Sequence, residues 1–476
     1  MTRRGNWYFG FAILMWASII GAAHPPATAQ APAPASGVVT FARDVLPILQ
    51  KHCQSCHRPG QIGPMSLLDY SSARPWAQAI KTKVRSREMP PWDADPAYGH
   101  FTNDRSLSRQ EIDTLTAWAD GGAALGNPSD APAPVRWPSG GWLVEPEVIV
   151  DLPEYQVPAR GTIEWENIAI RSPFKSDTWV SSIEILPSDP STVHHMCFEF
   201  KAPQPNIVYN QYEWAEVPRD ADGAASRRQG DQAAGGGSGD NWVSTRDVGS
   251  TEVKRRPGRP TLFPMPKHCY VPGMSLHDYR PYEAGLLVPG GADIHINLHY
   301  QTTGKPAVDR MRLGFTLAKR TPRKKLVQLV PTGTTANFAI PPNESNYAAP
   351  VVEVQIRKDA ELVWMSPHMH FRGKDMTWTL TRPDGRQQVV LSVPRYRYAW
   401  QLLYQTRVPV PAGSKFTFIA HYDNSSANRD NPNPNVWVRP GNQAWEEMMV
   451  PFTWLVVDTD VNDRDVTSPY TRGDGA

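Results

Sequence analysis

Two cysteines and a histidine stand close together near the start of this chain of 476 residues, at Cys53, Cys56 and His57. The apolar positions before them recur at helical spacing, which predicts an amphipathic helix over residues 41–53 that runs directly into the motif. The C-x-x-C-H spacing is typical of covalent c-type haem attachment, in which both thiols bond the porphyrin and the histidine ligates the iron. A zinc or redox C-x-x-C that happens to precede a histidine is the alternative.

Helical patterns continue after this motif. A second helix is predicted over residues 72–87, and a third opens at the capping box of Ser108 and Glu111. The prolines that follow Met89 place this methionine on a loop. A thioether opposite a histidine is the usual ligation of an electron-transfer haem, so we expect Met89 to be the sixth iron ligand, with Met65 as the alternative.

Residues 38–126 resemble a small class I cytochrome c. The likeness rests on the C-x-x-C-H motif, on the Gly63-Pro64 pair shortly after it and on the three helical patterns. The resemblance implies an all-α haem domain with one covalently bound haem c. The stretch that follows, residues 127–144, is rich in Pro, Gly and Ser and is predicted to be a linker.

The first residues have the pattern of a secretory signal. A charged start and an apolar run precede an A-x-A cleavage site at Ala27 and Ala29, which predicts a signal peptide over residues 1–29. An uncleaved membrane anchor is the alternative. No other apolar run is long enough to cross a bilayer, so we expect a periplasmic or secreted protein without a stable membrane span after cleavage.

Length and composition narrow the classes further. A chain of 476 residues is too long for one core and predicts two or three domains. The net charge of +2 gives no reason to expect a nucleic-acid partner. In an oxidising compartment Cys197 and Cys269 could form one disulfide, although the sequence does not show how far apart they lie.

From residue 145 the pattern changes to short β-type runs broken by Pro, Gly and Asn. Such runs predict two all-β antiparallel sandwiches, the first over residues 145–325 and the second over 326–470. An insert over residues 219–260, Gly-rich and with a short basic run, is predicted to be a mobile loop. The expected strands include residues 148–152, 179–186, 193–200, 351–356, 362–364, 376–381, 415–422 and 451–457.

Histidines stand at several places in this β region. On a regular strand His368 and His370 would project from one face and could hold one metal ion. His194 and His195 are adjacent, so both reach one ion only at a strand end or a bulge. The apolar residues that alternate with His299 predict that it lies on a strand face turned away from the core. Imidazole together with thioether is a ligand set that suits copper.

Four motifs resemble, in order, residue type and separation, those of the copper type II, ascorbate-dependent monooxygenases, the group that contains peptidylglycine α-hydroxylating monooxygenase and dopamine β-monooxygenase. The motifs are His194-His195-Met196, Leu298-His299-Tyr300, His368-Met369-His370 and Glu447-Met448. The resemblance covers about residues 145–460. It implies two jelly-roll domains that face each other across a solvent-filled cleft, each with one copper.

The resemblance also implies a role for each ligand. His194, His195 and His299 would bind an electron-transfer copper. The catalytic copper, at which O2 is activated and hydrogen is abstracted from the substrate, would be bound by the remaining three residues, His368, His370 and Met448.

Three positions depart from the peptide-amidating members of this family. Ser366, Val450 and Phe452 stand where those enzymes have an arginine, an asparagine and a tyrosine that hold the peptide carboxylate. A carboxylate without such partners would be costly to desolvate. We therefore expect a less charged substrate than a glycine-extended peptide.

These observations predict an exported copper-dependent monooxygenase that hydroxylates a C–H bond of a small organic substrate with O2. Its electrons would come through the fused haem, from ascorbate or from a periplasmic donor. One alternative is a non-catalytic periplasmic copper and haem electron-transfer protein, and another is a haem domain joined to a β-type binding module. Two dissimilar ligand sets favour the enzyme, because a carrier does not need both.

Overall fold

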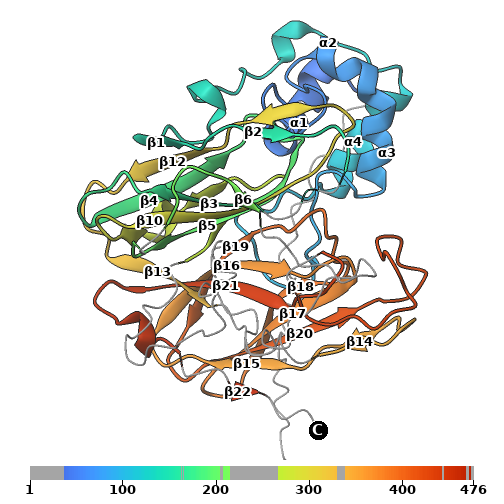
Figure 1. The fold of residues 1–476 in the computed structure, drawn as a ribbon. Helices are drawn as coiled ribbons and strands as arrows, with labels where there is room; N and C mark the ends of the chain where they lie inside the picture. The colour runs from blue at the N-terminus through green and yellow to red at the C-terminus, as the bar shows by residue number, and fades with distance from the viewer. Residues whose placement is uncertain are drawn as a thin grey trace, which may run out of the picture. The chain divides into compact units, whose positions relative to one another are not determined.

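This chain folds mostly into β-sheet, with a few short helices, as expected for β-sandwich domains (Figure 1). The computed structural model describes residues 37–161, 163, 166–203, 207–214, 266–329, 338–441, 444–467 and 471–472. The predicted signal peptide over residues 1–29 and the predicted mobile insert over residues 219–260 lie outside the described residues.

The helices follow one another in the first described part of the chain, which we call the helical segment (residues 39–126). The capping box predicted at its last helix is confirmed, because the Ser108 hydroxyl accepts from the Glu111 N–H and the Glu111 carboxylate accepts from the Ser108 N–H. Such a cap is worth about 1 kcal/mol. The elements are η1 (Phe41–Val45), α1 (Leu46–His52), α2 (Tyr70–Ala73), η2 (Arg74–Trp76), α3 (Ala77–Arg85) and α4 (Arg109–Asp120).

The helical segment has a buried apolar cluster of its own. Val45 and Leu49, two of the apolar residues at helical spacing before the C-x-x-C-H motif, are completely buried together with Leu115 and Trp118 of α4. The Trp118 indole N–H donates to the carbonyl of Ala124, so burial of this ring leaves no polar atom unpaired.

The rest of the described chain is built from short strands. Each predicted strand overlaps an observed strand, and residues 415–422 form a strand with the expected bounds, whereas the strand predicted over residues 362–364 extends over residues 360–368. The strands are β1 (Val148–Asp151), β2 (Tyr155–Val157), β3 (Glu166–Arg171), β4 (Thr178–Leu186), β5 (Val193–Lys201), β6 (Glu213–Trp214), β7 (His268–Tyr270), β8 (Leu276–Asp278), β9 (Ala284–Val288), β10 (Asp293–Tyr300), β11 (Ala307–Asp309), β12 (Arg312–Leu317), β13 (Lys324–Leu329), β14 (Tyr347–Ala348), β15 (Val352–Gln355), β16 (Ala360–His368), β17 (Gly373–Thr381), β18 (Gln387–Val393), β19 (Tyr404–Val410), β20 (Lys415–Tyr422), β21 (Val450–Asp458) and β22 (Thr471–Arg472).

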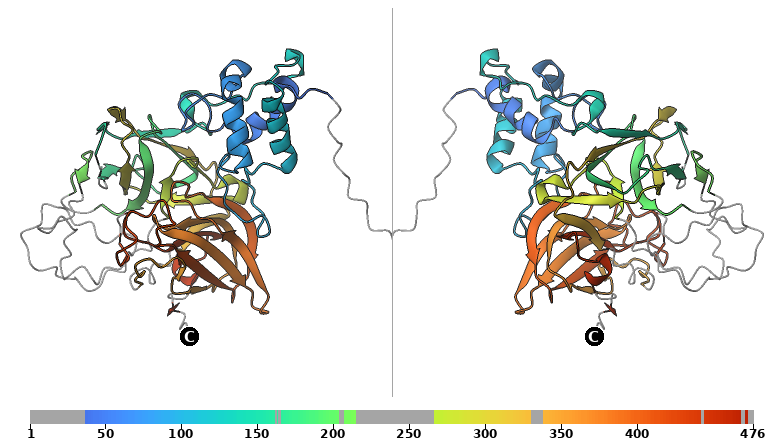
Figure 2. Two further views of the ribbon diagram at one scale, coloured as in Figure 1. Left: turned by 90° about the vertical axis from the view of Figure 1, so that its right-hand side faces the viewer. Right: turned by 90° about the vertical axis from the view of Figure 1, so that its left-hand side faces the viewer.

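Three larger sheets organise these strands. A five-stranded sheet has the order β6-β3-β10-β5-β7, and a second sheet has the order β18-β17-β20-β15-β22, whose orange and red strands Figure 2 shows from two further sides. The third sheet, β1-β12-β4-β9-β13-β21-β16-β19, passes through both predicted sandwiches. Strand β13 joins its two halves, since it pairs in parallel with β9 and antiparallel with β21.

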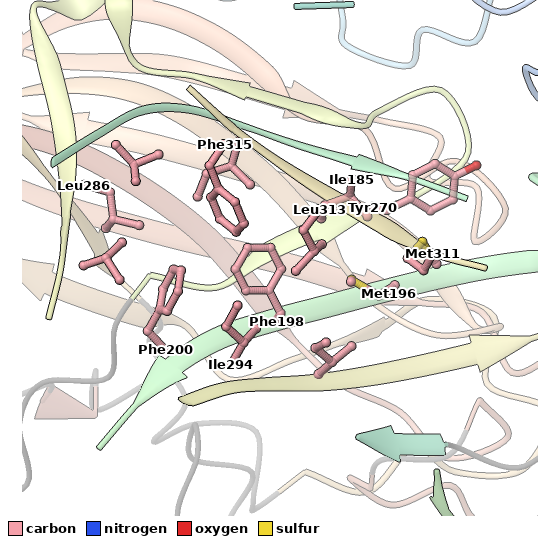
Figure 3. Packing of buried hydrophobic residues seen from close by; sticks show 14 of the residues in the cluster. Ile185, Met196, Phe198, Phe200, Tyr270, Leu286, Ile294, Met311, Leu313 and Phe315 are labelled. Carbon is pink, nitrogen blue, oxygen red and sulfur yellow. The ribbon is translucent and has the colours of Figure 1, made fainter. Parts of the chain in front are cut away.

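Each half of the β region has its own core. In the first half, Phe198, Phe315 and Ile294 pack together from β5, β12 and β10 (Figure 3). In the second half, Trp378 of β17 and Phe418 of β20 are directly paired in the sheet, and both are completely buried.

The stretch predicted as a linker, residues 127–144, contacts its surroundings on both sides. The Gln50 side chain donates to the Ala133 carbonyl at 3.0 Å, and the Arg312 guanidinium donates to the Gly140 carbonyl at 2.7 Å. Both contacts lie within the compact unit Val39–Ala476. Among the residues that the structure describes, no helix combines the length and apolar character that a membrane span requires.

Candidate metal centres

The first histidine group is assembled by a β-bulge. His195 of β5 pairs with His299 of β10, but the next aligned pair is Val193 with Tyr300. His194 is therefore an extra residue in β5. A bulge of this kind turns a side chain out of the strict alternation of a strand, so two adjacent histidines can point to one place. Of the two possibilities that the sequence left open, a strand end or a bulge, the structure shows the bulge.

The three side chains come together closely. Each of His194, His195 and His299 offers one ring nitrogen, and these nitrogens lie within 4.8 Å of one another. The Nδ1 atoms of His194 and His195 are 2.9 Å apart. No other group of three His, Cys, Asp or Glu residues in the described part of the chain has metal-binding spacing. The cluster could hold a metal ion with imidazole ligands.

Burial keeps these imidazoles neutral. Desolvation lowers the pKa of His194 to about 4, and the neighbouring His299 and His368 act in the same direction. Desolvation also holds the pKa of His195 far below its ordinary value. It lowers the pKa of His299 as well, against an opposing hydrogen bond to the backbone of Ile163. Neutral rings have a nitrogen lone pair available at neutral pH, which metal binding requires.

A disulfide supports the strand that carries this group. Cys197 of β5 and Cys269 of β7 are directly paired in the sheet and form a disulfide. The bond lies two residues after His195, so it fixes β7 to the strand next to the bulge. The pairing that the sequence left open is thereby established.

The second histidine pair lies at the end of a strand. β16 ends at His368, and His370 lies in the turn before β17. The expectation that both histidines stand on one regular strand is therefore wrong for His370. The two imidazole rings still lie close together, with centroids 5.3 Å apart.

Hydrogen bonds fix the orientation of both rings. The Nδ1 of His368 is 2.6 Å from the Gln401 side-chain oxygen, and the Nδ1 of His370 is 3.1 Å from the Glu446 carbonyl. Both partners are acceptors, so each Nδ1 carries the proton and each Nε2 keeps its lone pair. Desolvation lowers the pKa of His368, which keeps that ring neutral. Two such Nε2 atoms are suited to a shared metal ion.

Glu447 holds the turn that follows His368. This completely buried carboxylate accepts the backbone N–H of His370 at 2.8 Å and that of Arg372 at 2.6 Å. Burial raises the pKa of Glu447 to about 8, against the effect of these donors and of the Arg372 charge. The interactions bring the segment around Met448 to the turn, although the two lie far apart in the sequence.

Along the chain, Met448 is flanked by two residues that lie next to the histidine pair. Glu446, two residues before it, is hydrogen-bonded to His370, and Val450, two residues after it, is aligned with His368 in the pairing of β21 with β16. Met448 itself is half-buried, and its carbonyl accepts a hydrogen bond from Tyr422 at 2.7 Å. Its position is compatible with a thioether ligand, which stays a prediction.

The three departures from the peptide-amidating pattern lie on β16 and β21 beside His368. Ser366 is aligned with Phe452 across β16 and β21, and the Phe452 ring lies 5.9 Å from the His368 ring. Ser366 and Val450 are both buried. The side chains that β21 places next to His368 are therefore apolar.

Sequence reasoning missed two residues between β18 and β19. The ring of Tyr398 stacks on the His194 ring with centroids 4.7 Å apart and meets the His370 ring at 6.4 Å. Gln401 of the same segment is the hydrogen-bond partner of His368. Neither residue has a regular spacing from the histidines, so no pattern in the sequence could have identified them.

The haem-attachment motif lies at the end of α1. Cys53 and Cys56 are free thiols, and desolvation raises the pKa of Cys53 to about 12. The Nδ1 of His57 donates to the Met65 carbonyl at 3.3 Å, which leaves Nε2 for an iron ion. A Cβ at Gly63 would stand only 2.6 Å from this Nδ1, so the loop approaches the ring as closely as a glycine allows. These residues fit a covalently bound haem.

The sixth ligand of such a haem remains a prediction. Met89 is half-buried after α3, and its backbone N–H donates to the Lys83 carbonyl. Met65 packs against the core of the helical segment and contacts His57 through its carbonyl.

No family model matches this chain, and no curated protein matches it either.

Proposed function

We propose that this chain is an exported copper-dependent monooxygenase that hydroxylates a C–H bond of a small organic substrate with O2. In this proposal two β-sandwiches of jelly-roll type each hold one copper. His194, His195 and His299 form the first ligand set, and His368, His370 and Met448 form the second. The helical segment is a c-type haem domain with Cys53, Cys56 and His57 as attachment residues and Met89 as the preferred sixth ligand.

One observation carries the proposal, namely that two dissimilar imidazole groups meet at a single residue. One histidine of each group contacts the Tyr398 ring, namely His194 of the three and His370 of the pair. A protein that only carries electrons needs one such group. Two groups of different composition at short range fit a division between storing an electron and activating O2.

The chain's own residues prepare the two groups for metal. When bound, copper would store one electron at each group and activate O2 at the group that includes a thioether. Gln401 and the Glu446 carbonyl orient the imidazoles of the second group, and Glu447 fixes the backbone between them. The Phe452 ring covers His368 and presents an apolar surface to a substrate.

The helical segment contacts the β region close to these groups. The Arg397 guanidinium donates to the Asp93 carboxylate at 2.9 Å, and the Asn103 amide donates to the Leu403 carbonyl at 2.7 Å. A bound haem would add a one-electron carrier on this segment. The contacts hold the helical segment against the β region, and in this proposal the haem delivers electrons to the first group, with ascorbate or a periplasmic donor as the primary source.

The Cys197–Cys269 disulfide supports export, because structural disulfides are typical of oxidising compartments. The predicted signal peptide leads to the same location. A periplasmic or secreted protein is therefore part of the proposal.

The proposal is tested by O2 uptake of the copper-loaded protein with ascorbate across a panel of small apolar compounds. With the right compound, uptake should depend on substrate and the product should contain one oxygen atom from labelled O2. The His368→Ala variant should lose this activity and keep its haem spectrum. A protein that binds both metals but never incorporates label from O2 is an electron-transfer protein instead.

A further inference from the structure

We propose that Tyr398 couples the two histidine groups and is the route by which an electron passes from the first to the second. This inference rests on the proposed function. It goes beyond it by assigning a role to a residue outside both ligand sets.

Tyr398 contacts the first group face to face. Its ring stacks on the His194 imidazole with a centroid distance of 4.7 Å and an interplanar angle of 23°. Stacking at this distance is van der Waals contact between two π systems. His194 is the extra residue of the bulge in β5, so it is the member of the first group that the bulge turns toward a partner.

The same ring contacts the second group edge to face. Its centroid is 6.4 Å from that of His370 at an angle of 87°, and it packs at 4.6 Å against Phe371. The His194 and His370 rings cannot be farther apart than the two centroid distances together. The resemblance implies a solvent-filled cleft between the two coppers, whereas here one aromatic ring touches a histidine of each group.

The segment around Tyr398 is fixed on both sides of the ring. The preceding residue, Arg397, pairs with Asp93 of the helical segment, whose side chain is buried. Three residues later, Gln401 is hydrogen-bonded to His368 and donates to the Tyr398 carbonyl at 3.4 Å. A ring held in this way keeps its place between the groups and needs little reorganisation when an electron passes.

The step itself is a transfer of one electron. Ascorbate or another one-electron reductant supplies the first group, and the electron then passes to an oxidised metal at the second group. No bond forms or breaks. The Tyr398 ring bridges the two imidazoles without a net change in its own oxidation state, and its phenol keeps its proton. A phenylalanine ring should therefore serve nearly as well, while an aliphatic side chain of similar volume should not.

The test uses the full chain loaded with copper and compares the wild type with Tyr398→Phe and Tyr398→Leu. Tyr347→Leu is the matched control, since Tyr347 is a half-buried tyrosine that contacts Phe338 rather than a histidine. Copper per chain is measured first. One electron is then injected into the fully oxidised protein by pulse radiolysis, and freeze-quenched EPR follows its redistribution between the two Cu(II) signals.

We expect Tyr398→Leu to keep both coppers and to slow the redistribution at least tenfold. Tyr398→Phe and Tyr347→Leu should retain the wild-type rate. Redistribution at the wild-type rate in Tyr398→Leu, or equal slowing in Tyr398→Phe, would overturn the inference. The readout needs no substrate. Wild-type protein that redistributes the electron but oxygenates nothing would refute the proposed function and leave this inference standing, and failure to bind copper at both groups would refute both.

Discussion

His195 lies directly opposite His299 in the antiparallel pairing of β5 with β10. The pairing brings two histidines from separate strands to one place, and the bulge at His194 adds the third. The first group thus depends on strand register. A slip of one residue would send His195 and its neighbours to the other face of the sheet.

Replacement of His194 should remove one metal and leave the other. We expect His194→Ala to reduce the copper content from two per chain to one, because its ring supplies one of three nitrogens. His295→Ala is the control, since His295 is buried on the same strand as His299 but belongs to neither ligand set. Elemental analysis after dialysis checks this result. An equal loss of copper in both variants would mean that general destabilisation, not ligation, is responsible.

The sixth haem ligand can be identified by two matched substitutions. Met89→Ala should abolish the sulfur-to-iron charge-transfer band of the oxidised haem and lower its reduction potential, because a thioether ligand raises that potential. Met65→Ala should change the spectrum only slightly, since His57 contacts the Met65 carbonyl, which alanine retains. If only Met65→Ala removes the band, then Met65 is the ligand and our preference for Met89 is wrong.

Glu184 should make stability depend on pH. This buried carboxyl accepts the backbone N–H groups of Leu143 and Val144, and desolvation raises its pKa from 4.5 to about 7. Between these values the folded protein holds more protons than the unfolded chain, so stability is lost as pH rises from 4.5 through 7 and is constant above it. The loss is on the order of 3 kcal/mol.

Glu184→Gln provides the measurement of this effect. The amide oxygen can accept from the same backbone groups but does not titrate. The free energy of unfolding of the variant, minus that of the wild type, should rise as pH increases from 5 to 7.5. A difference that does not change with pH would show that Glu184 has an ordinary pKa in the folded protein.

The substrate should be apolar near the reacting carbon. Phe452 and Val450 stand next to His368, and Ser366 occupies the position where peptide-amidating enzymes have an arginine. A substrate carboxylate would therefore be left without a partner. Glycine-extended peptides should give less than one hundredth of the oxygenation rate of the best apolar substrate. Phe452→Tyr adds a hydroxyl group to the apolar surface next to His368 and should lower kcat/KM for apolar substrates. Efficient turnover of a glycine-extended peptide by the unchanged protein would contradict this prediction.

Local patterns predicted the elements of the fold well. The alternation over β10 correctly placed Ile294, Ile296 and Leu298 in the core, and all three are completely buried. That β13 joins the two halves of the largest sheet was not predictable from the sequence. Its partners β9 and β21 lie about 40 and 130 residues away along the chain. Sequence periodicity indicates which face of a strand is buried but not which edge finds a partner.

The same distinction holds for the two histidine groups. The conflict between two adjacent histidines was enough to expect either a strand end or a bulge at this point of the chain. The position of His370 beyond the end of β16 was not, since Glu447 fixes that turn through backbone hydrogen bonds from a distant part of the chain. Tyr398 could not be predicted for a similar reason, because its contacts arise only from tertiary packing.

The most direct test of the account is X-ray absorption of the fully reduced, copper-loaded protein together with its copper content. We predict two coppers per chain and a copper–sulfur contribution from one of them. In Met448→Leu the sulfur contribution should vanish, while Met449→Leu, an adjacent and completely buried methionine, should retain it. A wild-type protein that binds a single copper, or whose sulfur contribution persists in Met448→Leu, would contradict the assignment of two dissimilar copper groups.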